Sequence, residues 1–368
     1  MSLNLVCKKE ELTSAISTVQ KAVPSKTTYP ILEGILLKAK GDCLVLTANN
    51  LEMGIECRIK ADVKEEGEIV IESRIFGEII RRMPDAEISI EEKNDNVKIT
   101  CKNSKFEIKG TRAENFPIIP EIEKEKTLKV CQAVIKDMIR QTIFAVGEDE
   151  NRPILTGVNI EAKNGVLTFV SIDGFRLALR KYHIEDKNVD INVIVPGKIL
   201  NEIGKILAPV EDEVSIYISK NQIMFDTGNT KILSRLLEGE YFNYENVIPE
   251  EYESKLLRIS KKELLNSIER ASILITSDGA RFPITITLNV DKVVITTNTN
   301  LGSATEEIYT EVTGNNIYIK FNPRYFIEAL RVIEEEFIDV LFSSDMGPCI
   351  IKSVDKDTFI YLLLPLKK

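Results

Sequence analysis

The stretch RIFGEIIR, residues 74–81, returns twice along the chain, as KILNEIGK at residues 198–205 and as RYFIEALR at residues 324–331. Each copy has a basic residue, a glutamate four positions later and a second basic residue seven positions after the first. The steps between copies are 124 and 126 residues. A charge pattern kept over such distances indicates one domain-sized unit written three times.

Other segments repeat with nearly the same step, which separates a true repeat from a chance match. Residues 47–53 align with 171–177 and 297–303, and residues 30–32 align with 153–155 and 283–285. We therefore predict domains at 1–125, 126–253 and 254–368, joined at the charged segments 121–126 and 250–255. Each would have about 120 residues, near the usual size of a domain.

Within each unit the apolar pattern predicts both strands and helices. Alternation with a period of two predicts strands with one buried face at 87–90, 97–101, 214–218, 223–225, 293–297 and 317–321. A first helix is expected near Lys9–Lys21, Ile135–Phe144 and Lys261–Ala271, the last one opened by a capping box of Ser260 and Glu263. The second helix of each unit carries the basic triplet.

Helical geometry places the three charged residues of a triplet on one face. The opposite face is apolar in every copy: Phe76, Ile79, Ile80, Met83; Leu200, Ile203, Gly204, Leu207; Phe326, Ala329, Leu330, Ile333. Three equivalent helices should bury this face on a sheet and point two cations outward. The plainer alternative is a solvated face of paired glutamates and cations, each pair stabilising the helix by a few tenths of a kcal/mol.

The overall charge argues against a nucleic-acid binder, but its distribution argues for one. The chain has 48 basic and 57 acidic residues, a net charge of −9. The six predicted helices with their flanks sum to +7, which leaves −16 for the rest. Positive helices in a negative body suit a protein that holds a polyanion on one surface and repels it elsewhere.

Catalytic motifs are missing from the sequence. The six cysteines form no CxxC pair, so we expect reduced thiols rather than disulfides or a zinc site. The single histidine, His183, stands in a charged stretch, no phosphate-binding glycine motif occurs, and the acidic run Glu148–Glu150 lacks ligand spacing. No signal-like or membrane-length apolar segment occurs. We expect no catalytic residue, cofactor, metal or membrane contact, and a cytoplasmic location.

The threefold repeat, the segments Ser171–Leu177 and Arg235–Pro249 and the apolar C-terminal tail Leu362–Leu366 resemble the bacterial DNA polymerase III beta subunits, the replication sliding clamps. The resemblance covers the whole chain. It implies an α+β clamp fold: three similar domains per chain, each with two helices packed on antiparallel sheets, and a head-to-tail homodimer ring with helices around duplex DNA. It also implies a non-catalytic processivity factor.

The repeat and the resemblance together nominate cations that face DNA: Arg74, Arg81, Arg82, Lys21, Arg140, Lys198, Lys205, Lys261, Arg324 and Arg331. Contacts to phosphate carry no sequence information, so binding of double-stranded DNA should be independent of sequence. Weak, salt-screened contacts would let the duplex slide while the closed ring prevents escape.

The resemblance implies a partner-peptide pocket between the second and third domains. The matching positions are Leu155, Ile172, Gly174, Phe175, Arg176, Leu177, Phe242, Val247, Leu362, Leu364, Pro365 and Leu366. Many family members have histidine at the position of Phe175 and methionine at those of Leu364 and Leu366, which leaves the peptide preference open. Read without the resemblance, the tail leucines can also simply close the last strand over the core.

The implied partners are a second copy of the chain and, through short linear peptides, the catalytic subunit of DNA polymerase III, the clamp loader, other DNA polymerases and repair proteins. The positions matching the family's ring contact are Phe106, Ile108, Lys102 and Lys105 in the first domain and Ile273, Leu274, Glu306 and Glu307 in the third. Two alternatives stay open at this point: a specialised clamp paralogue in repair or drug resistance, and an enzyme with an interdomain active site.

Overall fold

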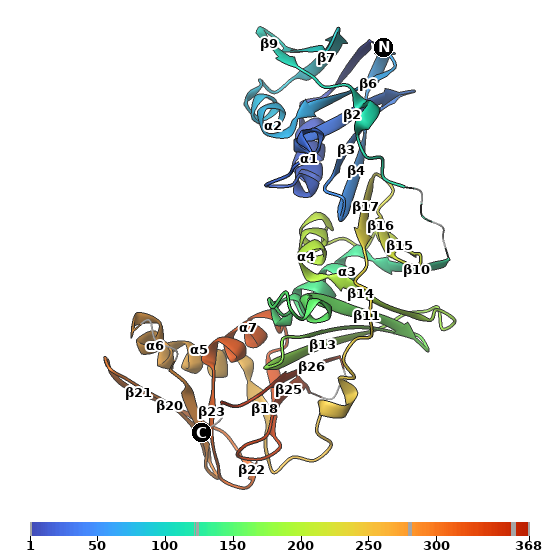
Figure 1. The fold of residues 1–368 in the computed structure, drawn as a ribbon. Coiled ribbons are helices and arrows are strands. Elements are labelled where there is room, and N and C mark those ends of the chain that lie inside the picture. Colours follow the sequence, from blue (N-terminus) through green and yellow to red (C-terminus); the bar gives the residue numbers. More distant parts are fainter. Residues whose placement is uncertain (1, 121, 123–124, 279–281, 355–357, 367–368) are drawn as a thin grey trace. The chain divides into compact units, whose positions relative to one another are not determined.

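The computed structural model describes residues 2–120, 122, 125–278, 282–354 and 358–366 (Figure 1). The elements of the first third are β1 (Leu3–Lys8), α1 (Lys9–Val19), β2 (Gly34–Lys40), β3 (Cys43–Asn49), β4 (Met53–Lys60), β5 (Asp62–Glu65), β6 (Gly67–Glu72), α2 (Ser73–Arg82), β7 (Glu87–Lys93), β8 (Asn96–Cys101) and β9 (Ser104–Lys109).

The second third has β10 (Lys126–Cys131), α3 (Gln132–Arg140), β11 (Gly157–Lys163), β12 (Val166–Ile172), β13 (Arg176–His183), β14 (Ile191–Pro196), α4 (Gly197–Ile206), β15 (Glu213–Ile218), β16 (Gln222–Asp226) and β17 (Thr230–Arg235). The last third has β18 (Ser254–Ser260), α5 (Lys261–Ala271), α6 (Ile273–Asp278), β19 (Ile284–Leu288), β20 (Lys292–Thr299), β21 (Gly302–Tyr309), β22 (Thr313–Gly314), β23 (Ile317–Phe321), α7 (Pro323–Val332), β24 (Phe337–Phe342), β25 (Cys349–Ser353) and β26 (Phe359–Leu363).

The element order repeats as the sequence predicts. A strand, a helix, a run of strands, a second helix and three further strands follow one another in each third, and in the last third the short α6 is added between the first helix and the strands. The turn after the third strand is built by the same hydrogen bond in each copy, from a backbone N–H to the side-chain oxygen two residues earlier: Leu51 to Asn49 (2.7 Å), Phe175 to Asp173 (2.8 Å) and Leu301 to Thr299 (3.2 Å). The repeat is therefore one of local structure as well as of charge.

The chain folds into two compact units, unit 1 (residues 1–133 and 205–236) and unit 2 (residues 134–204 and 237–368). Within the described residues, unit 1 has one sheet in the order β5-β1-β7-β8-β9 and another in the order β10-β15-β16-β17-β4-β3-β2-β6. Unit 2 has a sheet in the order β14-β11-β12-β13-β26-β25-β24-β18-β22 and another in the order β21-β20-β19-β23. The strand pairs within them are antiparallel, as in β17 with β4 and β13 with β26.

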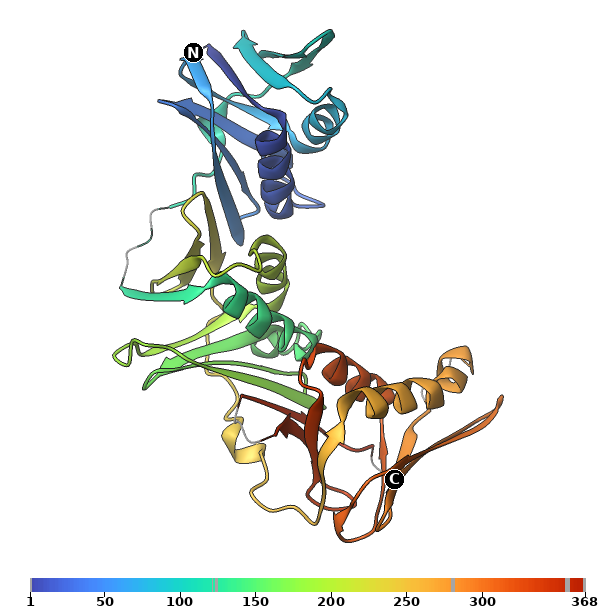
Figure 2. The ribbon, with the colours of Figure 1, turned by 180° about the vertical axis from the view of Figure 1, so that it is seen from behind.

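Helices pack in pairs against these sheets. In unit 1, α1 lies beside α2 and against β4, and in unit 2, α5 lies beside α7 (Figures 1 and 2). The core of unit 2 gathers apolar side chains from β18, α5, the sheet β21-β20-β19-β23, α7 and β24–β26. None of the helices in the described ranges combines the length and the hydropathy of a membrane span.

The predicted helix boundaries hold, with two corrections. The helix predicted at Lys9–Lys21 is an α-helix only over Lys9–Val19, and Lys21 lies in the 3₁₀ turn Gln20–Ala22 that follows. The first helix of the last third, α5, begins and ends where predicted. The Ser260 hydroxyl accepts a hydrogen bond from Glu263 N (3.3 Å), which is half of the predicted capping box. The helix predicted at Ile135–Phe144 instead spans Gln132–Arg140. Thr142 leaves helical geometry and its hydroxyl donates to Met138 O (2.7 Å), so a separate 3₁₀ turn follows at Ile143–Ala145.

The predicted domain boundaries remain a prediction. Part of the first joint, residues 121 and 123–124, lies outside the described residues. The second joint runs from the loop after the 3₁₀ turn Glu245–Val247 into β18.

Candidate functional site

The three basic triplets lie on α2, α4 and α7, and their cations are exposed. This holds for Arg74, Arg81 and Arg82, for Lys198 and Lys205, and for Arg324 and Arg331. In each helix these residues lie opposite the buried apolar face, whose largest members, Phe76, Leu200 and Phe326, are at most 1% exposed. The predicted orientation of the three helices is therefore confirmed.

Gly204, the weakest member of the apolar face, has a packing role. A methyl group there would come within 3.0 Å of Ile139, and the Gly204 carbonyl accepts a hydrogen bond from Lys136 Nζ (2.7 Å). The glycine thus lets α4 lie against Ile139 of α3, which would have to shift to make room for a larger residue.

Several of the exposed cations also pair with carboxylates. Glu78 accepts from Arg81 (2.6 Å) and Arg82 (3.2 Å), and these contacts lower the pKa of its carboxyl. Arg331 pairs with Glu269 of the neighbouring α5 (2.8 Å). Solvent screens exposed pairs of this kind, so they stabilise little and leave the cations able to exchange partners.

The cations nominated on the first helices are placed differently. Lys21, Arg140 and Lys261 are only partly exposed. The Arg140 guanidinium donates to Val332 O (3.0 Å) and forms ion pairs with Asp137 and Glu334. Arg140 therefore ties α3 to the end of α7, a structural role that sequence reasoning missed.

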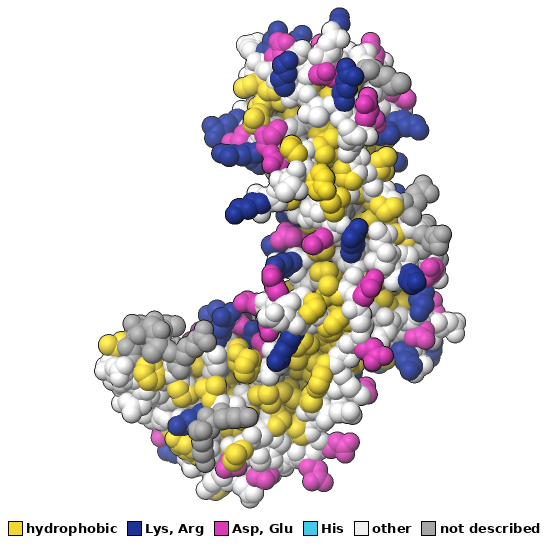
Figure 3. Space-filling view, in the orientation of Figure 1, with side chains coloured by type: hydrophobic (Ala, Val, Ile, Leu, Met, Phe, Trp, Pro, Cys, Tyr) yellow, Lys and Arg dark blue, Asp and Glu magenta, His cyan; other side chains and the backbone are white. Residues whose placement is uncertain are grey.

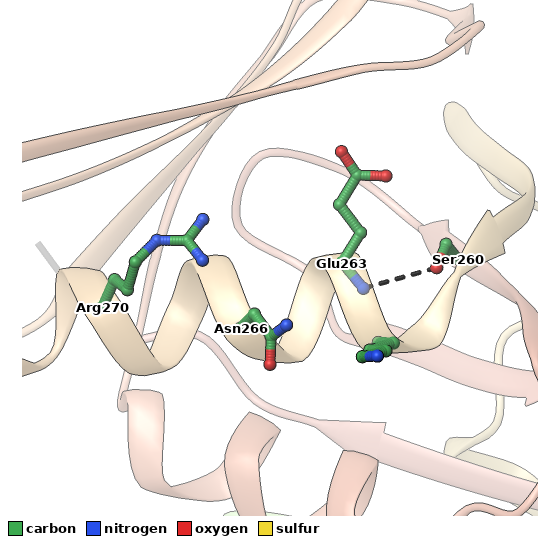
Figure 4. Close-up of a pocket in the computed structure, with 5 residues that line it drawn as sticks. Ser260, Glu263, Asn266 and Arg270 are labelled. Atoms are coloured by element: carbon green, nitrogen blue, oxygen red, sulfur yellow. Dashed lines mark hydrogen bonds between the residues drawn. The ribbon is translucent and has the colours of Figure 1, made fainter.

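A small surface pocket of about 240 Å³ lies along α5 (Figure 4). Its lining is polar: Ser260, Lys262, Glu263, Asn266 and Arg270. The Arg270 guanidinium is held by Glu306 of β21 (2.5 Å), and Ser260 caps the helix. Because these two groups already have partners within the chain, the pocket adds no candidate for chemistry.

The positions nominated for ring closure lie on two sheet edges. β9 is the last strand of its sheet and carries exposed Lys105 and Phe106, with Phe106 44% exposed. β21 is likewise terminal among the described strands of its sheet. Next to β21, α6 presents Ile273, which is 57% exposed, and the half-buried Leu274.

The charged positions of this set behave differently on the two edges. Lys102 and Lys105 are exposed, whereas Glu306 pairs with Arg270 and Glu307 with Lys292 (2.8 Å) in the same chain. Hydrogen bonds from these cations lower the pKa of both carboxyls. The β21 glutamates would have to share or exchange their cations to meet the lysines of another chain.

The nominated peptide-binding residues of the middle and last thirds come together in unit 2. Ile172, Leu177 and Leu362 belong to one buried cluster with Leu179, Tyr244, Leu341 and Ile350, and Leu155 packs against it. β13 and β26 create this arrangement, because Leu177 and Leu362 are partners in their antiparallel ladder.

Five other nominated apolar side chains are exposed, and we call them the rim. Its members are Phe175 (58% exposed), Phe242 (50%), Val247 (39%), Leu364 (39%) and Leu366 (41%). Figure 3 shows hydrophobic side chains gathered on the face of this unit that carries β13, β25 and β26. We call this rim, the buried Ile172, Arg176, Leu177 and Leu362, and the partly buried Leu155 and Pro365 the tail patch.

The tail lies across the turn rather than ending with the strand. Beyond β26, Leu364 N donates to Phe175 O (2.8 Å) and Leu366 N donates to Lys320 O of β23 (2.8 Å). Leu362 and Leu363 are buried, but Leu364 and Leu366 are partly exposed. The tail leucines therefore divide: two close the core, and two contribute an apolar surface that water still reaches.

Arg176 is the buried charge of the tail patch, at 6% exposure. Its Nε donates to Asp173 Oδ2 (2.9 Å), its Nη2 donates to Phe144 O, and the guanidinium lies 4.6 Å from the centre of the Tyr325 ring. Tyr325 in turn stacks with Phe175 at 6.4 Å. A buried cation so fully bonded fixes the turn on which Phe175 stands.

The residues screened for catalysis have ordinary surroundings. Asp149 Oδ1 accepts from Asn151 N (3.0 Å), which lowers the pKa of its exposed carboxyl, and His183 is exposed at the end of β13. The described part of the chain brings together no metal-binding group of histidine, cysteine, aspartate and glutamate. The cysteines are free thiols, and burial followed by the nearby Glu11 raises the pKa of Cys7 to about 12.

Comparison with known proteins accounts for the whole chain. Family models of the DNA polymerase III beta subunit match in order: the N-terminal domain at residues 3–120, the central domain at 129–243 and the C-terminal domain at 245–367. The chain belongs to the DNA polymerase III beta subunit family.

Individual relatives agree with this assignment. The beta sliding clamp of Halalkalibacterium halodurans is 34% identical over 380 residues, covering 99% of this chain and 100% of the relative. The crystal structure of the Bacillus subtilis sliding clamp superposes with a TM-score of 0.97 at 32% identity, covering 100% of both chains. A putative beta subunit from Eubacterium rectale gives a TM-score of 0.95 at 38% identity, covering 99% of both.

The resemblance identified in the sequence is thereby confirmed. The chain has the three-domain sliding-clamp fold, and as a sliding clamp it is a processivity factor of DNA polymerase rather than an enzyme. The comparisons do not favour either alternative, the specialised clamp paralogue or the enzyme with an interdomain active site.

Sequence reasoning missed several residues of the clamp's tail patch. Tyr325, Tyr244 and Phe144 support it, and Asp173 fixes its turn. Asp173 carried a signal, because an aspartate two residues before Phe175 is typical of an Asx turn. Tyr325 stands inside the third triplet, but only the fold reveals that it faces Phe175.

Proposed function

We propose that two copies of this clamp close head to tail into a ring that holds duplex DNA without regard to sequence. The observation that carries the proposal is the set of exposed cations on α2, α4 and α7, each opposite a buried face of the same helix. The acidic remainder of the chain would repel DNA from other surfaces.

A test of topology addresses this proposal directly. Protein loaded onto nicked circular DNA and then washed in high salt should stay bound, because salt screens the phosphate contacts but cannot open a closed ring. Linearising the same DNA should release the protein from its ends. Equal loss from circular and linear DNA would refute encirclement.

Ring closure would use β9 of one copy and β21 of the other. Both strands lie at a sheet edge, so they have backbone groups directed away from their described sheet partners. β9 with its flank contributes Lys102, Lys105 and Phe106, and β21 with α6 contributes Glu306, Glu307 and Ile273. Opposite charges beside exposed apolar side chains suit a heterologous contact, which forms a ring if its rotation closes.

The tail patch would bind short hydrophobic peptides of the polymerase III catalytic subunit, the clamp loader, other polymerases and repair proteins. Apolar side chains around a few fixed polar groups are what such a peptide requires. A fluorescent peptide with hydrophobic anchors, patterned on a polymerase clamp-binding motif, should bind with a dissociation constant in the micromolar range, about −8 kcal/mol. Phe175→Ala and Phe242→Ala should each weaken it, whereas Leu257→Ala, at a 51% exposed position on β18, should not.

We further propose that the domains end near residues 125 and 253 and that the protein works in the cytoplasm. Free and partly buried cysteine thiols are compatible with a reducing compartment.

A further inference from the structure

The carboxylate of Glu328 on α7 is shared by two arginines with different surroundings. Its Oε2 accepts from Nη1 of the buried Arg176, and its Oε1 accepts from Nε of Arg324 (2.6 Å), whose side chain is 69% exposed. Glu328 itself is 26% exposed. One carboxylate therefore joins the turn of the tail patch to the exposed face of a triplet helix.

This arrangement differs from that of the first copy of the repeat. There the equivalent Glu78 pairs with Arg81 and Arg82 of its own helix. Glu328 instead reaches back to β13, 152 residues earlier in the chain. The stability of α7 alone would not require the contact with Arg176, because Glu328 already forms an i,i+4 ion pair with Arg324 on the same helix.

Arg176 transmits the position of Glu328 to the patch. Its guanidinium lies against Tyr325, which stacks with Phe175, and it is also bonded to Asp173, whose carboxylate fixes the backbone N–H of Phe175. Any change in the pull of Glu328 on Arg176 therefore acts on the most exposed aromatic residue of the patch.

We propose that Glu328 couples the DNA-facing surface to the tail patch, so that a phosphate at Arg324 strengthens peptide binding. An anion that draws Arg324 away leaves the Glu328 charge compensated by Arg176 alone, which tightens their contact. The turn at Phe175 is then held more firmly, and a preorganised site binds its peptide with a smaller loss of conformational entropy. Glu328 is thus a positioning residue, and the inference rests on the proposed DNA and peptide sites.

The coupling should be modest and reciprocal. Partly exposed ion pairs of this type change affinities by about two- to fivefold. By thermodynamic linkage, a peptide that stabilises the same turn would raise DNA affinity by the same factor. Such a clamp would hold partners best while it is on DNA.

A double-mutant cycle tests the coupling with the hydrophobic-anchor peptide. Arg324→Ala mimics withdrawal of the arginine and should tighten peptide binding by about two- to fivefold. Glu328→Gln should weaken binding, and the double variant should match Glu328→Gln alone, because Arg324 acts only through Glu328. Arg331→Ala is the matched control, since it removes an exposed cation of the same helix that pairs with Glu269 instead. Thermal unfolding checks that each variant is folded.

Two further measurements distinguish a failure of the proposed coupling from a failure of the proposed peptide site. A short linear duplex at low salt should tighten peptide binding to the unaltered clamp and leave Arg324→Ala unchanged. If Phe175→Ala weakens binding but Arg324→Ala does not tighten it, only the coupling is overturned. An equal effect of Arg331→Ala, or an equal effect of DNA on Arg324→Ala, also overturns it. If Phe175→Ala has no effect, the patch assignment itself fails.

Discussion

Replacing Ile273 and Leu274 by alanine should convert the dimer into a folded monomer. Ile273 begins α6 beside the β21 edge and is 57% exposed, while Leu274 is half-buried. Ile273 therefore has more of its side chain available to a neighbour than packed on its own core, whereas most of Leu274 is buried. We expect thermal unfolding to change little and association to change greatly.

The size of the effect follows from the exposed fraction. Complete burial of an isoleucine side chain stabilises by about 1.5–3 kcal/mol, so the part of Ile273 that is still exposed could contribute about 0.9–1.7 kcal/mol at one contact. A ring has two equivalent contacts, which makes the loss about 2–3 kcal/mol and weakens the dimer by about 30- to 150-fold before Leu274 is counted.

Analytical ultracentrifugation across a concentration series measures this directly. Leu257→Ala is the control, because Leu257 is similarly exposed, at 51%, but stands on β18. Head-to-tail geometry adds a second test: Phe106→Ala and Ile273→Ala proteins, each weakened alone, should associate better when mixed, because one of the two contacts in a mixed ring is unchanged. A dimer of the Ile273→Ala, Leu274→Ala protein that persists unaltered at low micromolar concentration would refute the interface.

Three further predictions concern the DNA-facing cations, the C-terminal tail and the dependence of stability on pH. Replacing Arg74, Lys198 and Arg324 by glutamate should preserve folding and dimerisation but lower DNA affinity. The slope of log affinity against log salt concentration should become shallower by about 0.9 for each phosphate that the protein no longer neutralises. Undiminished DNA retention at low salt would mean that the triplets are only solvated faces. Deleting residues 364–368 should weaken the anchor peptide at least tenfold, about 1.4 kcal/mol, and leave the dimer intact; a ring that dissolves instead would show that the tail is core. Burial raises the pKa of Glu328, but the hydrogen bonds and charges of Arg324 and Arg176 outweigh burial and leave the pKa lowered. The Glu328 carboxylate therefore stabilises the folded protein above about pH 4.3, and this stabilisation is lost as the pH falls through the folded-state pKa. A Glu328→Gln protein should lose less stability on acidification, and identical acid unfolding curves would contradict this.

The helices were predictable because their signal is local. The charge and apolar periods fix which face of α2, α4 and α7 is buried, and the capping residue Ser260 fixes where α5 begins. The end of α3 was not predictable, because Thr142 stops the helix with a side-chain bond that an apolar pattern does not reveal.

The tail patch was only partly predictable, for a related reason. Its nominated apolar members came from matching family positions. The contacts that fix its turn join residues far apart in sequence, as in Arg176 with Glu328 and Phe175 with Tyr325. The residue pattern within each segment does not indicate a contact with a residue so far away in the sequence. For the same reason Arg140 was nominated as a DNA contact although it ties α3 to the end of α7.

The shared sheets have a consequence for how the chain can be divided. β17 completes its ladder on β4 of the preceding domain, and β13 does so on β26 of the following one. A fragment excised after residue 125 or 253 would keep its own helices but leave a row of backbone donors and acceptors without their strand partner. Recombinant single domains should therefore tend to aggregate or swap strands, and limited proteolysis should clip the connecting loops without releasing a repeat.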